Sequence, residues 1–225
     1  MPGKIEKLIT PLFHRFFVIR DDGSQRQKLA AQFANGDILE IGCAGKPNSL
    51  LRGTKLIGFD FVEPESNLPP NYTGFVRGDV RDLTLFFTPN SFDTIVALEV
   101  IEHLPDHCAF FSALARLIRP NGKVILSTPN PYYFSTFVAN VFFKNGFSAS
   151  SRGGGTAEGR NITLGPYYGH IHLHLPRIMN LIAFERGLIL VKLSASTGWN
   201  IPFLAANLMY VYERQIEGEI QRCGE

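Results

Sequence analysis

The chain has 225 residues, of which 45% are apolar and 19% are charged, and its mean hydropathy of +0.03 is that of an ordinary globular protein with one substantial core. A net charge of +2 gives no strong nucleic-acid signal, because such binding needs a basic patch that the totals do not show. Cys43, Cys108 and Cys223 are too few and too far apart for a disulfide framework or a paired-cysteine metal site, and this usage favours a reducing, cytoplasmic location.

The N-terminal part is expected to be helical. Residues 4–18 show the apolar spacing of an amphipathic helix, which Pro11 would kink. This helix either packs on the domain as a cap or attaches to a membrane surface. Its charged residues argue against a signal peptide, and the longest apolar stretch, residues 201–212, is too short to span a bilayer. A second short helix is expected over residues 24–34.

Strands and helices then alternate. Short apolar or mixed runs predict strands over residues 37–41, 55–59 and 74–77. Residues 92–98 form an apolar, β-branched run that is typical of a strand buried on both faces. Residues 110–118 show helical spacing, and a turn at 120–122 precedes another buried strand at 123–127. This alternation indicates an α/β fold with a mostly parallel, doubly wound sheet.

The composition changes after residue 131. Residues 132–147 are rich in aromatic side chains and expected to be helical, and the glycine-rich residues 148–165 are expected to form a loop that is either a lid or simply mobile. Pro176 suits the first turn of a helix that ends near Arg186. A strand follows over residues 188–194, and residues 208–214 fit a last antiparallel strand or a helix.

We therefore expect one domain over residues 1–225. Its parts are an N-terminal helical cap (1–35), a cofactor-binding half (36–130), an acceptor-side insertion (131–175) and a C-terminal helix with strands (176–225).

The most informative local pattern is a strand that runs into a loop of small residues. The loop begins at Gly42, and the next strand ends on Asp60, twenty residues after Glu40. Small residues let the backbone approach a ligand, and a carboxylate at a strand end can accept hydrogen bonds from both ribose hydroxyls. The pattern thus indicates a nucleoside-type cofactor. Cys43 is interpreted as a small packing residue, because nothing nearby suggests an activating base.

Five segments in order extend this pattern, namely residues 40–45, 58–60, 77–80, 92–104 and 117–130. Together they resemble the class I S-adenosylmethionine-dependent methyltransferases, most of all the branch with quinone-biosynthesis and natural-product enzymes. The resemblance covers roughly residues 36–195. It implies a Rossmann-like sheet with S-adenosylmethionine as the cofactor.

The resemblance also implies roles for individual residues. Glu40 and the loop would lie against the methionine end, Asp60 would accept from the ribose hydroxyls, Asp79 from the adenine amino group, and Glu99 would close the methionine side. The implied cofactor-binding set is Glu40, Gly42, Ala44, Gly45, Asp60, Phe61, Asp79, Val80 and Glu99. As alternatives, Asp60 is a turn former and Asp79 part of a charged loop.

The chain departs from the family pattern at two positions of the glycine loop. Ala44 and Lys46 stand where the family usually has glycines, and Pro47 follows at once. A side chain at position 46 would either narrow the pocket or reach an anionic group.

The segment after residue 98 supplies candidate proton acceptors. If a helical turn follows the strand, Glu99, Glu102 and His103 share one face, and His103 titrates in the range suited to a general base. Alternatively, Glu102 and His103 only brace the helix. His170, one of three alternating histidines, is a further catalytic candidate.

A metal site is a second possibility that the resemblance raises. The segment is similar to metal-dependent 2′-O-methyltransferases of small-RNA ends, and carried over, Glu99, Glu102, His103 and His170 would hold a divalent metal. The same residues are widespread in the superfamily without a metal, so the metal is not favoured and its identity is not predicted.

We therefore expect methyl transfer to a small-molecule acceptor, with an oxygen as the favoured acceptor atom. The aromatic residues after Asn130 either pack an inserted helix or bind an apolar or aromatic acceptor. The competing hypotheses are metal-assisted 2′-hydroxyl methylation of RNA and a cofactor-binding module without turnover. The acceptor and the oligomeric state are not predicted.

Overall fold

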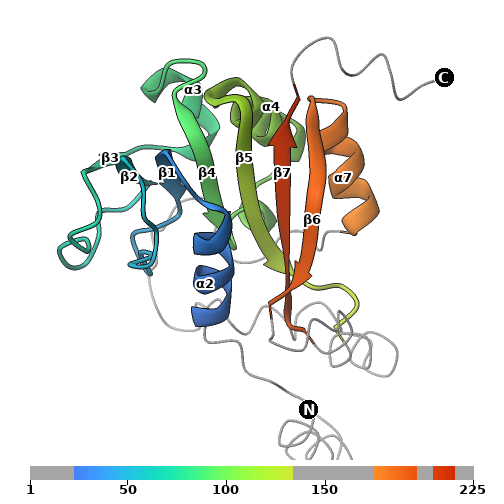
Figure 1. Cartoon of the computed structure of the whole chain (residues 1–225), viewed down its shortest axis with the longest axis horizontal. Coiled ribbons are helices and arrows are strands. Elements are labelled where there is room, and N and C mark those ends of the chain that lie inside the picture. The colour runs from blue at the N-terminus through green and yellow to red at the C-terminus, as the bar shows by residue number, and fades with distance from the viewer. Residues whose placement is uncertain (1–22, 134–174, 197–204, 216–225) are drawn as a thin grey trace, which may run out of the picture.

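The computed structural model describes residues 23–133, 175–196 and 205–215. Seven strands form one sheet in the order β3-β2-β1-β4-β5-β7-β6 (Figure 1). The strands are β1 (Asp37–Ile41), β2 (Lys55–Asp60), β3 (Gly74–Arg77), β4 (Phe92–Leu98), β5 (Ile118–Pro129), β6 (Leu188–Ala195) and β7 (Asn207–Arg214). The helices are α2 (Ser24–Phe33), α3 (Leu83–Phe86), α4 (His107–Leu117) and α7 (Pro176–Phe184), with 3-10 turns η1 (Val80–Asp82) and η2 (Ile101–His103).

The sheet is parallel from β3 to β5, and β7 runs antiparallel to both β5 and β6. The predicted α/β, doubly wound and mostly parallel fold is therefore confirmed. Of the two alternatives for residues 208–214, the antiparallel strand is the one formed, since residues 207–213 pair with β5. The predicted N-terminal cap over 4–18 and the insertion up to residue 174 lie outside the described residues, apart from its first three positions.

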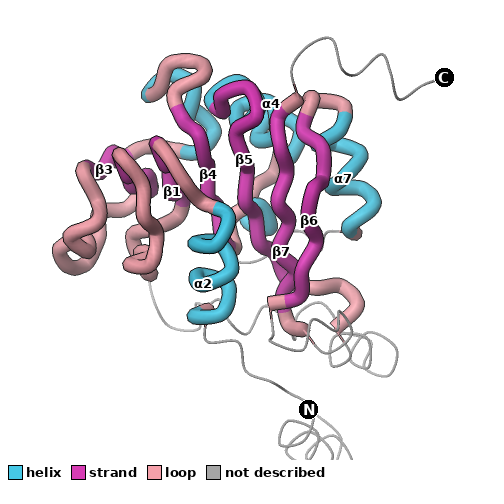
Figure 2. Tube along the Cα trace, in the orientation of Figure 1, coloured by secondary structure: helices cyan, strands magenta, loops and turns pink. Residues whose placement is uncertain are grey.

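Helices cover both faces of the sheet, so two cores form (Figures 1 and 2). The larger core holds apolar side chains of α3, α4 and α7 against one face, with Phe111 and Leu114 fully buried. The smaller core lies under α2 on the other face and contains Ala30 and Leu51. Strand β4 contributes to both, because Ile95 and Val96 point to opposite faces.

Element boundaries differ from the sequence expectation at α4 and β5. Helix α4 begins at His107, three residues early, because the Asp106 carboxylate accepts from the Ala109 amide at 2.8 Å and caps the first turn. Strand β5 begins at Ile118 and continues through the predicted turn, where Asn121 has a φ of 63°. Helix α7 ends at Phe184, two residues before the expected end, and Gly187, with a φ of 73°, lies in the turn that follows it.

Candidate cofactor and active site

The candidate site lies where the parallel strands end. The chain winds outward through β1, β2 and β3 and then returns to place β4 on the other side of β1. Such a reversal leaves a crevice beyond the carboxyl ends of the strands. Asp60 is the last residue of β2, Asp79 follows β3, and Glu99 follows β4. The fold thus brings the predicted acids to one edge of the sheet.

The loop after β1 requires glycine at its first position. Gly42 has a φ of 79°, and a β carbon there would lie 2.6 Å from Cγ2 of Val100. Its amide donates to the Phe59 carbonyl at 2.8 Å, which ties the loop to β2. Gly45 differs, because a β carbon there would meet nothing within 4 Å. The loop therefore leaves open space at Gly45, where a ligand can approach the backbone.

Glu40 is buried beneath this loop. Its carboxylate accepts a hydrogen bond from the Tyr72 hydroxyl and one from the Asn48 amide at 3.3 Å. Burial raises the pKa of Glu40 from its usual 4.5 to about 8, and the Asn48 hydrogen bond opposes this only in part. In this structure Glu40 holds the far end of the loop in place; its predicted contact with the cofactor stays a prediction.

Asp60 connects the loop to the end of β2. One carboxylate oxygen accepts from the Ala44 amide at 2.9 Å, and the other accepts from the Val62 amide at 3.3 Å. Because an ionised carboxylate offers about four acceptor positions, both oxygens keep capacity for a further donor. Phe61, the next residue, is 44% exposed, and its ring is therefore accessible to a ligand at this edge.

Asp79 caps the turn η1 at the next strand end. Its carboxylate accepts from the Arg81 amide at 2.9 Å and forms an ion pair with the Arg81 guanidinium at 2.6 Å. The hydrogen bond from Arg81 lowers the pKa of Asp79, which keeps this side chain ionised. The half-buried Val80 begins the turn.

Glu99 has the most partners among the predicted site residues. It adopts a φ of 58° directly after β4. Its carboxylate accepts from the Ser127 hydroxyl at 2.7 Å and from the side-chain amide of Asn207, and it pairs with Arg26 of α2 at 2.8 Å. This residue joins α2, β4, β5 and β7 at the carboxyl edge.

Glu102 lies close to Glu99 and is fully buried. Burial, and then the charge of Glu99, raise the pKa of Glu102 well above its usual value, while Arg26 and the Thr128 hydroxyl oppose the shift. The raised pKa favours the protonated form of Glu102, which can donate a hydrogen bond. His103 ends η2 and is half-buried. The expected helical turn is present as a 3-10 turn.

Some predictions lie outside the described residues, namely His170 and the aromatic residues 134–147. Within residues 23–133, 175–196 and 205–215, no group of three or more His, Cys, Asp or Glu side chains could hold a metal ion. The four-residue metal set that includes His170 thus stays a hypothesis. Cys43 is buried, and burial raises the pKa of its thiol to about 12, as suits a packing residue.

Sequence reasoning missed Arg26, Tyr72 and Asn207. None of them lies in the five motif segments that carry the resemblance, and each contacts a site residue that is distant in sequence. The sequence carries no local signal for such contacts.

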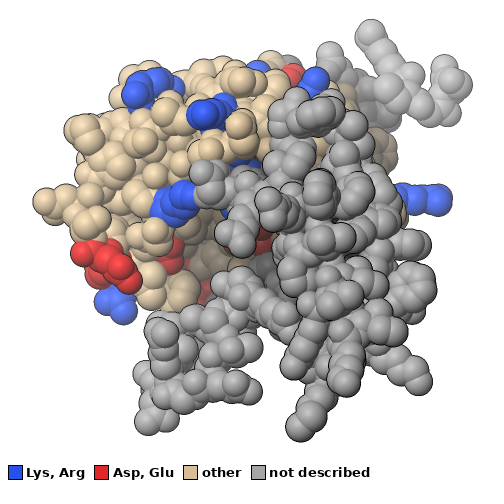
Figure 3. Space-filling model, turned by 90° about the horizontal axis from the view of Figure 1, so that it is seen from below, with Lys and Arg blue, Asp and Glu red and all other residues tan. Residues whose placement is uncertain are grey.

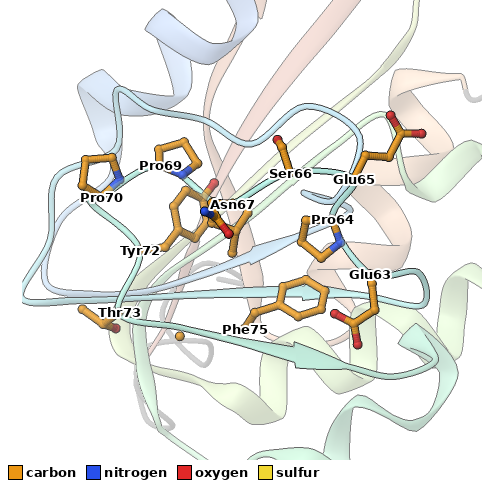
Figure 4. A pocket seen from close by; sticks show the side chains of 12 residues that line it. Glu63, Pro64, Glu65, Ser66, Asn67, Pro69, Pro70, Tyr72, Thr73 and Phe75 are labelled. Carbon is orange, nitrogen blue, oxygen red and sulfur yellow. The ribbon is translucent and has the colours of Figure 1, made fainter.

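A separate hollow of about 550 Å³ lies at the loop that joins β2 and β3 (Figure 4). Its walls come from residues 63–70 and 72–75, so none of the predicted site residues lines it. The ring of Tyr72 forms part of its wall, and the hydroxyl of the same side chain donates to Glu40. The hollow therefore belongs to the surface of this loop and is distinct from the candidate site.

Seen from the side on which β5 ends, the described Lys, Arg, Asp and Glu side chains form small separate groups (Figure 3). The coloured part of this face shows no continuous basic band. None of the helices in the described ranges is long and apolar enough to cross a membrane.

The strand order, the antiparallel β7 and the acids at successive strand ends define the Rossmann-like fold of class I methyltransferases. A family model described as "Methyltransferase domain" matches residues 13–193, and the chain belongs to this family. The methyl donor of this family is S-adenosylmethionine.

Curated relatives match part of the chain. It is 36% identical over 141 residues to a "Probable S-adenosylmethionine-dependent methyltransferase" of Mycolicibacterium smegmatis, covering 60% of this chain and 54% of the relative. It is 30% identical over 124 residues to a ubiquinone biosynthesis O-methyltransferase of Dechloromonas aromatica, covering 49% of this chain and 53% of the relative. The chain thus spans about half the length of the curated relatives it matches.

Solved structures are similar in fold. An S-adenosylmethionine-dependent methyltransferase from Clostridium acetobutylicum has a TM-score of 0.59 at 11% identity, covering 95% of this chain and 100% of that one. The N-methyltransferase NodS from Bradyrhizobium japonicum, in complex with S-adenosyl-L-homocysteine, has a TM-score of 0.52 at 17% identity, covering 85% and 86%. At these identities the likeness concerns the fold alone.

Proposed function

We propose that this domain transfers the methyl group of S-adenosylmethionine to an oxygen atom of a small-molecule acceptor. The observation that supports the proposal most directly is the edge at which Gly45, Asp60, Asp79 and Glu99 follow four adjacent strands. S-adenosylmethionine supplies an activated methyl group on a sulfonium, so the protein has to orient the two reactants and assist proton removal.

The side chains present fit such a donor. Open space at Gly45 permits close approach to the loop, and the remaining acceptor positions of Asp60 suit two ribose hydroxyls. At Asp79 an adenine amino group would replace the guanidinium of Arg81, whose side chain is 56% exposed.

The choice of oxygen rests on two arguments. One of the two curated relatives above is named as a ubiquinone biosynthesis O-methyltransferase. A hydroxyl acceptor also has a proton to lose, and His103, the proposed proton acceptor, ends the turn that follows β4 at the same edge. Glu102, whose pKa is raised by burial, is proposed as a hydrogen-bond donor and not as the base.

The proposal is tested by incubating purified protein with methyl-labelled S-adenosylmethionine and a cell extract, with and without a chelator. We expect label in a small apolar metabolite, unaffected by the chelator. Chelator-sensitive label in RNA would favour metal-assisted 2′-hydroxyl methylation instead. Donor binding without any transfer would indicate a cofactor-binding module.

Replacement of Asp60 tests the donor site. We expect Asp60→Ala to weaken binding of S-adenosylhomocysteine by about 1–3 kcal/mol, because two charge-assisted hydrogen bonds are lost. Titration calorimetry measures the effect, and Glu65→Ala, which removes an exposed acid from the following loop, serves as the matched control. Equal affinities for the two variants would remove Asp60 from the ribose site.

A further inference from the structure

Lys46 departs from the family pattern, and the structure shows where its side chain goes. It crosses from the loop after β1 to Gly23, directly before α2. A β carbon placed on Gly23 would lie 2.9 Å from Nζ of Lys46 and 3.0 Å from Nη2 of Arg26. Gly23 is buried beneath these two groups. Two cationic side chains from separate segments therefore meet over one backbone position.

Hydrogen bonds fix both segments relative to each other. The side-chain amide of Gln27 donates to the carbonyl of Lys46 at 3.2 Å and to that of Pro47 at 3.4 Å. In return, the side-chain amide of Asn48 donates to the Gln27 carbonyl at 3.1 Å. The first turn of α2 is thereby fastened to the loop, and the backbone of Lys46, an exposed residue, is held in position.

An acid lies beside one of the two cations. Arg26 forms its 2.8 Å ion pair with Glu99, whose side chain is 23% exposed. Through Arg26 the edge thus combines a carboxylate and a guanidinium, and the Lys46 ammonium lies over Gly23 on the other side of that guanidinium. The α-amino acid group carries an ammonium and a carboxylate on the same carbon, so its two charges are complementary to this arrangement.

The position along the sheet agrees with this chemistry. With the ribose at Asp60 and the adenine at Asp79, the nucleoside occupies the ends of β2 and β3. The rest of the donor must then extend in the opposite direction, past β1 toward β4, where Glu99 and Arg26 lie.

We infer that Lys46, together with Arg26, binds the α-carboxylate of the donor's methionine moiety, with Glu99 facing the ammonium. This inference rests on the proposed function. The lysine in place of a loop glycine makes the site select for adenosine derivatives that carry a carboxylate.

The test compares three probes by titration calorimetry: S-adenosylhomocysteine, decarboxylated S-adenosylmethionine, which keeps the amine, and 5′-methylthioadenosine, which lacks the whole amino acid group. We expect Lys46→Met to weaken S-adenosylhomocysteine binding by about 10- to 100-fold, because a charge-assisted hydrogen bond is lost. Binding of the two probes without a carboxylate should change less than about twofold. Lys46→Arg should restore most of the affinity.

Lys55→Met, an exposed lysine at the opposite edge of the sheet, is the control and should leave all three affinities unchanged. An unaltered affinity for S-adenosylhomocysteine in Lys46→Met would overturn the inference, as would an equal loss for all three probes. Failure of the wild-type protein to bind any probe would instead overturn the proposed function itself.

Discussion

Gly42 and Gly45 lie three positions apart in one loop, but the structure gives them different reasons to be glycine. Gly42 combines a φ of 79° with the contact of 2.6 Å that a β carbon would make to Val100. At Gly45 neither constraint exists, so only an approaching ligand would need the absence of a side chain. Replacing each glycine with alanine therefore distinguishes an effect on stability from an effect on ligand binding.

We expect Gly42→Ala to lower the free energy of unfolding by about 1–3 kcal/mol, because the left-handed backbone and the contact both become strained. Gly45→Ala should leave the free energy of unfolding within about 0.5 kcal/mol of the wild type and weaken S-adenosylhomocysteine binding. Urea unfolding and titration calorimetry on both variants measure these effects. If Gly45→Ala bound the ligand with full affinity, the donor would not approach this part of the loop.

At the scale of elements, buried strands are the part of the fold that sequence predicts well. The second half of β4, residues 95–98, is apolar at every position because helices cover both faces, and the predicted bounds of the strand match the structure. The start of β5 could not be predicted, because residues 120–122 have the composition of a turn. Asn121 takes a positive φ there, and the strand continues through this segment. Boundaries of this kind depend on pairing with a neighbouring strand, which local pattern does not reveal.

The same division applies to the candidate site. The positions of Gly42 and Asp60 at the carboxyl edge could be predicted, because each residue lies at a strand end. Arg26, Tyr72 and Asn207 could not, because each contact depends on which helix or strand packs above the edge. Tertiary packing alone selects these partners.

Helix α4 depends on its cap, which is an element-scale prediction. Asp106→Ala removes the acceptor for the Ala109 amide and should lower the free energy of unfolding by about 0.5–2 kcal/mol. Asp106→Asn keeps an acceptor oxygen and should lose clearly less. Chemical denaturation of both variants provides the comparison. Equal losses would mean that the charge of Asp106, and not its hydrogen bond, stabilises the helix.

At the scale of the whole molecule, two carboxyl groups are buried with raised pKa values, Glu40 at about 8 and Glu102 well above its usual range. In the unfolded chain both would ionise near their ordinary value of 4.5. Between that pH and the folded-state pKa, the native protein holds protons that the unfolded chain has released. Stability must therefore fall as pH rises through this window.

Glu40→Gln isolates one of these two contributions, because glutamine stays neutral and keeps an oxygen that can accept from Tyr72 and Asn48. From pH 5 to 8 the wild type should lose stability relative to the variant by on the order of 1 kcal/mol per pH unit, with the difference levelling off above about pH 8. Glu102 remains in both proteins, so its contribution cancels. Urea unfolding at each pH gives the difference, with the exposed Glu63→Gln as control. A difference that stays constant over this range would show that Glu40 is ionised in the folded protein, and the loop after β1 would then rest on a charged carboxylate.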